Sequence, residues 1–133
     1  MNTPAEIQCL ALIPCEYVHT SAGGQQQTVV GTFTAVEVPS VPTGGVRFAV
    51  YASFLGLVGD AEAAVRLHSP SGEEVAALSV AASSDDARSV QIVTFAFEDV
   101  TVAESGTHDL RLEVDSQLVA SRPLHVELLE GER

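Results

Sequence analysis

The chain has 133 residues, of which 46% are hydrophobic and none is tryptophan, and this length suffices for one domain with a self-supporting core. Its 18 acidic side chains face only 6 basic ones, so the formal net charge is -12 at pH 7. All six basic residues are arginines that stand singly along the chain. This distribution argues against a nucleic-acid partner, because such proteins neutralise phosphates with clustered cations.

In the first half of the chain, apolar and small residues alternate with a period of two, which is typical of β-strands. Three segments read as well-buried strands because both of their faces are apolar or small: residues 7–13, 28–38 and 46–58. Glycines and prolines in 21–24 and 39–45 separate them and predict turns. A shorter strand follows in 63–68, where Ala63, Val65 and Leu67 are expected to face inward.

The second half continues in the same way. Residues 74–80 and 89–97 read as further buried strands, and 107–114 alternates most clearly, with His108, Leu110 and Leu112 expected inside. The last segment, 118–128, contains Pro123, which cannot donate a ladder hydrogen bond and therefore predicts an edge position or a bulge. Beyond that proline, the row of Leu124, Val126 and Leu128 is expected to face the core.

Strands that recur roughly every 8 to 15 residues between turn signals are typical of a sandwich or barrel. We therefore predict an all-β fold, a two-layer antiparallel β-sandwich, Ig-like or related, with about seven to nine strands. No repeat, linker or low-complexity segment divides the sequence. The prediction is a single β-sandwich domain over residues 1–133.

Several pieces in a fixed order carry a family resemblance. They are Cys15-Glu16-Tyr17-Val18, Val30-Gly31-Thr32-Phe33, Ser69-Pro70-Ser71-Gly72, and a C-terminal block from Glu104 through Asp115 to Leu124. In this order the chain resembles a family of small uncharacterised bacterial β-sandwich proteins, a domain of unknown function. His108 stands where such proteins usually carry Tyr, and Asp115-Ser116 stands where an Asp-Gly turn is expected. The resemblance implies a compact sandwich and transfers no functional residues.

Transition-metal and redox sites find little support. The four histidines and two cysteines show no spacing typical of a zinc site. Cys9 and Cys15 lie six residues apart in an extended stretch, hence about 20 Å from each other, whereas a disulfide needs Cα atoms within about 7 Å. We expect both to be buried free thiols in a reducing compartment.

Calcium is the better metal candidate, because it prefers carboxylates and loop carbonyls. If successive strands are antiparallel, four aspartates share one end of the sandwich: Asp60, Asp85, Asp86 and Asp115. They are the candidate metal ligands of the sequence. Glu37, Glu73, Glu98, Asp99 and Glu104 share the opposite end.

An enzyme is not expected, because the sequence has no nucleophile elbow, and its paired carboxylates lie in solvated turns. Glycine pairs do not open helices and there is no lysine, so phosphate binding and a cofactor are not expected either. No segment reads as a secretion signal or a membrane span, and the default location is cytoplasmic.

Two functions follow. The leading one is a non-catalytic binding or structural module that acts through protein–protein contact, with an unidentified protein partner and with homodimerisation through a sheet edge or an apolar face as its mechanism. The alternative is a ligand-binding domain whose site lies at the loop end, with calcium as the most plausible ligand. The two differ in whether acidic groups from several loops converge.

Overall fold

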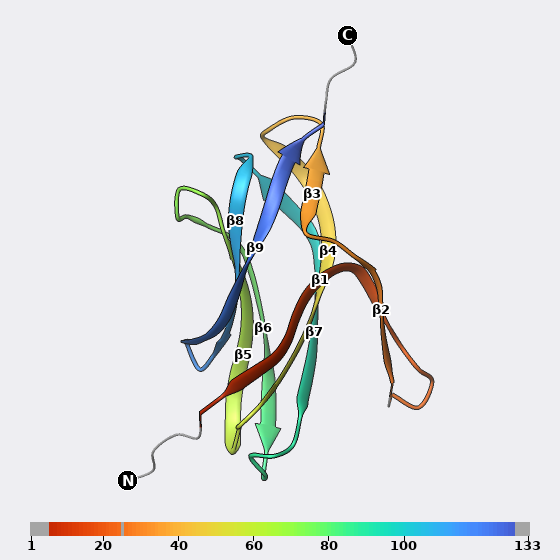
Figure 1. Ribbon diagram of the computed structural model, residues 1–133, viewed down its shortest axis with the longest axis vertical. Coiled ribbons are helices and arrows are strands. Elements are labelled where there is room, and N and C mark those ends of the chain that lie inside the picture. Colours follow the sequence, from red (N-terminus) through yellow and green to blue (C-terminus); the bar gives the residue numbers. More distant parts are fainter. Residues whose placement is uncertain (1–5, 25, 130–133) are drawn as a thin grey trace.

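The computed structural model describes residues 6–24 and 26–129. Nine strands form two sheets that pack face to face (Figure 1), and the described residues contain no helix. The predicted all-β, two-layer sandwich is therefore confirmed. Since the described part of the chain has no helix, it also has none that is long and apolar enough to cross a membrane.

The four-stranded sheet and the five-stranded sheet each combine strands that are distant in sequence. The four-stranded sheet has the order β2 (Gln27–Thr32), β1 (Gln8–Thr20), β4 (Thr43–Leu55) and β7 (Gln91–Val102). The five-stranded sheet has the order β3 (Ala35–Val38), β9 (Gln117–Leu128), β8 (Gly106–Val114), β5 (Gly59–His68) and β6 (Glu74–Ser84). At one side of the sandwich β6 lies beside β7, and at the other side β1 approaches β9.

The core lies between the sheets and consists of the inward rows that alternation predicts. Leu110 and Leu112 on β8 are fully buried, as are the three predicted residues of β5. From the other sheet, Phe48 on β4 stacks on Phe97 of β7 with ring centroids 4.9 Å apart. Burial of such side chains, at about 25 cal/mol per Å² of apolar surface, provides the main stabilisation of this fold.

One predicted strand is wrong. Residues 28–38 do not form a single strand but two, β2 and β3, which belong to different sheets. Gly31 adopts a φ of 70°, a conformation that favours glycine, and Phe33 then packs edge-on against Phe48 at 6.3 Å. The chain thus crosses from one layer to the other, and β3 pairs with β9 in parallel, an exception to the expected antiparallel pairing.

Two inward assignments are also corrected. Leu128 is 49% exposed because it is the last residue of β9 and lies beyond the core. Residues 74–80 were expected to form a well-buried strand, yet β6 is half-buried to exposed along its length. Its position at the sheet edge leaves these side chains covered on one flank only.

The turn between β8 and β9 consists of two residues, neither of which is glycine. Asp115 and Ser116 have φ values of 49° and 67°, the left-handed pair that a two-residue type I′ hairpin requires. Asp115 is anchored to β5 in both directions: its Oδ1 accepts a hydrogen bond from the Glu62 amide at 2.9 Å, and its own amide donates to the Glu62 carbonyl at 2.8 Å. The hairpin is therefore tied to the neighbouring strand.

Candidate functional site

The four predicted calcium ligands do not form a cluster. Asp60 pairs with Ser83 at the start of β5, while Asp85 and Asp86 follow β6. The carboxylate of Asp86 instead accepts the Arg88 amide at 2.9 Å, and this hydrogen bond, together with the Arg88 side chain, lowers the pKa of Asp86. Across residues 6–24 and 26–129, no three His, Cys, Asp or Glu side chains are placed to hold a metal ion.

His108 and the two cysteines are packed within the fold, and the sequence made a prediction about each of them. His108 is 1% exposed, with its Nδ1 3.2 Å from the Gly106 carbonyl oxygen, so the inward placement predicted for it is confirmed. Cys9 and Cys15 are free thiols; Cys15 is buried as predicted, whereas the buried position predicted for Cys9 is wrong, because Cys9 is only partly buried. Burial raises the pKa of both thiols, which disfavours the reactive thiolate.

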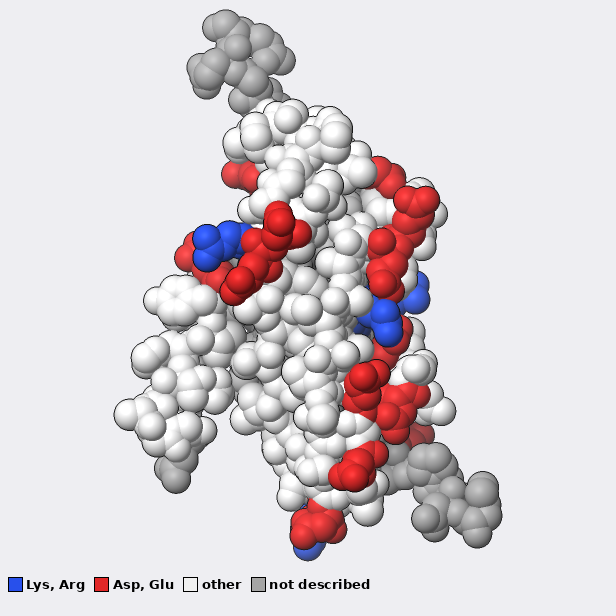
Figure 2. All heavy atoms as spheres, turned by 180° about the vertical axis from the view of Figure 1, so that it is seen from behind, with Lys and Arg blue, Asp and Glu red and all other residues white. Residues whose placement is uncertain are grey.

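Charge is divided unequally between the outer faces of the two sheets. The five-stranded sheet carries an ion-pair network in which Arg66 contacts Glu74 and Glu113 at 2.9 Å each. The outer face of the four-stranded sheet has three uncharged cross-strand rows: Ala11-Ser53-Ile92, Ile13-Tyr51-Thr94 and Cys15-Ala49-Ala96. Figure 2 shows acidic and arginine side chains along the margins of one view and a broad uncharged middle.

Sheet edges are the second feature that sets one side of the molecule apart, because an unpaired strand can bind another strand. On the side of β1 and β9, three features blunt parts of the sheet edges, although the outer edge of β2 carries none of them. β3 is only four residues long, Pro123 lies in the half of β9 that β3 does not reach, and Arg122 Nη1 donates to the Leu12 carbonyl of β1 at 2.8 Å. On the opposite side, β7 bulges where Glu98 and Asp99 interrupt its register with β4.

The edge of β6 has none of these devices. From Ala76 to Ser84 it pairs with β5 without a register shift, and this stretch contains no charged residue and no proline. Leu78 and Val80 are each 37% exposed, and Ile92 on the neighbouring β7 is 46% exposed. We call β6 from Ala76 to Ser84 the open edge.

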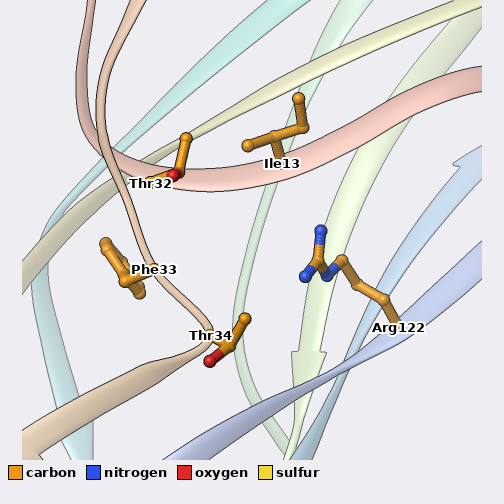
Figure 3. A pocket seen from close by; sticks show the side chains of 5 residues that line it. All are labelled: Ile13, Thr32, Phe33, Thr34 and Arg122. Carbon is orange, nitrogen blue, oxygen red and sulfur yellow. The ribbon is translucent and has the colours of Figure 1, made fainter.

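A hollow of about 430 Å³ lies where the chain crosses from β2 to β3, on the opposite side from the open edge. Ile13, Thr32, Phe33, Thr34 and Arg122 line it, and the guanidinium of Arg122 projects from β9 toward the crossover (Figure 3). Sequence reasoning missed this site. The one available signal was an arginine beside a proline in the middle of the last strand.

Comparison with known families assigns the chain. Residues 10–127 match the model of a family of unknown function (DUF6941). The protein belongs to this family. The predicted resemblance to a domain of unknown function is thereby confirmed, and the search of curated proteins gives no match.

Solved structures with a similar fold come from unrelated contexts. An immunoglobulin-like protein from Pseudomonas aeruginosa is 14% identical with a TM-score of 0.45, and the match covers 95% of this chain and 100% of that one. The alkylpurine DNA glycosylase AlkC from Pseudomonas fluorescens, bound to DNA with an abasic site analog, is 9% identical with a TM-score of 0.49. A β-glucosidase from Listeria innocua is 15% identical, also with a TM-score of 0.49.

This chain spans only a minor part of the length of the glycosylase and of the glucosidase. The matches cover 92% and 94% of this chain but only 31% of the glycosylase and 17% of the glucosidase. Nothing about activity follows from likeness at this level.

Proposed function

We propose that this DUF6941 protein is a non-catalytic module that associates with a second copy of itself by pairing the open edges of two β6 strands. The observation that carries the proposal is that β6 runs nine residues in regular register without charge, proline or bulge. Such an edge presents a row of unpaired backbone donors and acceptors that favours strand addition.

The charge distribution supports a second copy as the partner. At a net charge of -12, two copies repel each other unless they meet where acidic groups are absent. The open edge is such a place, because β6 carries no acidic side chain between Glu74 and Asp85. Pairing there also leaves the ion-pair network of the outer face in solvent, at Arg66 and Glu113.

The sequence of β6 is also self-complementary. An antiparallel pair with its two-fold axis at Ser79 places Leu78 opposite Val80 of the second copy, and the reverse, so the two half-exposed apolar residues cover each other. Glu74 then lies opposite Ser84, so no like charges meet directly within β6, and Glu73 and Asp85 come opposite each other only beyond the two ends of the strand. Cross-strand apolar pairs of this kind contribute about 0.2–1 kcal/mol each.

Light scattering coupled to size exclusion tests the proposal with Ser79→Lys. Ser79 is exposed, so lysine is accommodated in the single chain, but at the two-fold axis it faces its own copy and repels it. We expect the natural protein to be a dimer at high micromolar concentration and the variant to dissociate at least tenfold more readily. Thr28→Lys, an equally exposed change on the edge strand β2, is the matched control.

A second measurement locates the contact. Ser79→Cys places a thiol at the proposed axis, where cross-strand Cβ atoms are about 4.5–5.5 Å apart, and mild oxidation should link two chains. Thr28→Cys and the natural protein, with its half-buried Cys9 and buried Cys15, control for other thiols. A strictly monomeric natural protein, or a dimer that Ser79→Lys leaves intact, overturns the proposal.

A further inference from the structure

We infer that the hollow at the β2–β3 crossover is a binding site for the carboxylate group of a small, largely apolar acid, with Arg122 as its anchor. The inference is independent of the proposed self-association, since this hollow and the open edge lie on opposite sides of the sandwich. It rests on the way in which the guanidinium is held and on what surrounds it.

One edge of the Arg122 guanidinium is left for a ligand. Nη1 donates to the Leu12 carbonyl at 2.8 Å, which fixes the orientation of the side chain between the two sheets. The remaining edge consists of Nε and Nη2, and Nε is buried without a hydrogen-bond partner among the described residues. Buried donors of this kind are rare, because leaving one unpaired costs about 1–3 kcal/mol.

A carboxylate matches this edge, because its two oxygens accept two parallel N–H bonds from one guanidinium. Because Nε is buried, binding requires the guanidinium to turn toward the hollow from the orientation that Leu12 holds, so that Nε and Nη2 contact the acid together. Among the described residues, Arg122 is the sole charged group that lines the hollow, so a single negative charge is matched there and a doubly charged phosphate is not.

The other residues that line the hollow determine what kind of ligand body would fit there. Phe33 and Ile13 provide an aromatic ring and an aliphatic side chain, while Thr32 and Thr34 add methyl and hydroxyl groups. A volume of about 430 Å³ is at the lower end for small-molecule sites, which are mostly apolar with a few polar groups that fix orientation. A short-chain monocarboxylate therefore fits in size and in polarity.

Titration of the full chain with hexanoate, followed by amide and Arg Nε chemical shifts in NMR spectra, tests the inference. Hexanoate should shift the signals of Phe33, Thr34 and Arg122 Nε in a saturable way. Hexanol, which has the same chain without the charge, and inorganic phosphate should shift them at least tenfold more weakly. Equal responses to hexanoate and hexanol would overturn the assignment to a carboxylate.

Variants then identify the anchor. Arg122→Lys keeps the charge but loses the two-donor edge, and we expect it to weaken hexanoate binding at least tenfold, whereas Arg111→Lys on the outer face should bind as the natural protein does. Thr34→Leu fills the hollow and should abolish binding even if Arg122→Lys fails to fold. Unchanged binding in Thr34→Leu, or in a folded Arg122→Lys, refutes the inference, and Ser79→Lys should bind hexanoate normally whatever its oligomeric state.

Discussion

The two sides of the sandwich treat their sheet edges in opposite ways. Where β1 approaches β9, an arginine side chain binds the Leu12 carbonyl, a proline interrupts β9, and β3 covers four further residues. Where β6 lies beside β7, nine residues of β6 are regular and uncharged. The difference teaches that edge protection in this protein is applied strand by strand, which is why we propose the unprotected edge of β6 as a contact surface.

The largest expected effect concerns the core that both sides share. Leu112→Ala removes a fully buried side chain of β8 and should lower the free energy of unfolding by about 2–5 kcal/mol, because it leaves a cavity. Urea denaturation measures the loss, and Leu118→Ala, at a site that is 56% exposed, should cost less than about 0.5 kcal/mol. Similar costs for both variants would contradict the placement of the core between the sheets.

The next largest effect is expected on the side where β1 approaches β9. Arg122→Met removes the hydrogen bond to Leu12 and should cost about 1–3 kcal/mol in urea denaturation, because a buried acceptor is left unpaired. It also uncovers the edge of β1, so association should become more concentration-dependent. Arg111→Met loses only a surface ion pair with Asp109 and should cost under about 1 kcal/mol; an equal cost would remove the special role of Arg122.

A smaller effect is expected at the β8–β9 hairpin, which lies at neither of the two compared edges. Ser116→Gly relieves a side chain from a φ of 67° and should stabilise the fold by about 0.5–1 kcal/mol, since left-handed residues cost roughly 1–2 kcal/mol and the more flexible glycine offsets part of the gain. Thermal unfolding measures it. Ser121→Gly, in the body of β9, should destabilise instead, and a loss at both sites would count against the type I′ geometry.

The smallest effect on the single chain belongs to the open edge. Ser79→Lys should leave the free energy of unfolding within about 0.5 kcal/mol when measured at a concentration where the natural protein is also monomeric. Association and folding are then separated, because the same change is expected to weaken dimers at least tenfold. A large loss of monomer stability would show that β6 depends on Ser79 for its own packing.

Local alternation explains how much of the fold was predictable. On β8 each buried residue lies between polar neighbours in sequence, and on β5 Val65 precedes the half-buried Arg66, so Val65, Leu110 and His108 could be assigned to the core without knowledge of their partners. The division of residues 28–38 was not predictable in this way. It depends on the conformation of Gly31 and on the contact between Phe33 and Phe48, which are tertiary features.

The candidate sites depend still more on tertiary structure. The exposure of β6 follows from its place at the end of the sheet order, and the sequence of that strand contains nothing that specifies this order. Arg122 acquires its role only because β9 meets β1 on the far side of the sandwich. The aspartates failed as a group for the converse reason, since sharing one end of a sandwich does not bring carboxylates within reach of a common ion.

The parallel pairing of β3 with β9 has a consequence for synthesis on the ribosome. β3 ends at Val38, and the part of β9 with which it pairs begins at His125, so this short strand must wait until almost ninety further residues have been translated. Pairings over such separations form slowly, because the entropy of loop closure is lost before the pairing contacts can stabilise the chain. During this interval Val36 and Val38 of the nascent chain are therefore exposed to solvent. Chaperones should then bind mainly to the region just after Phe33.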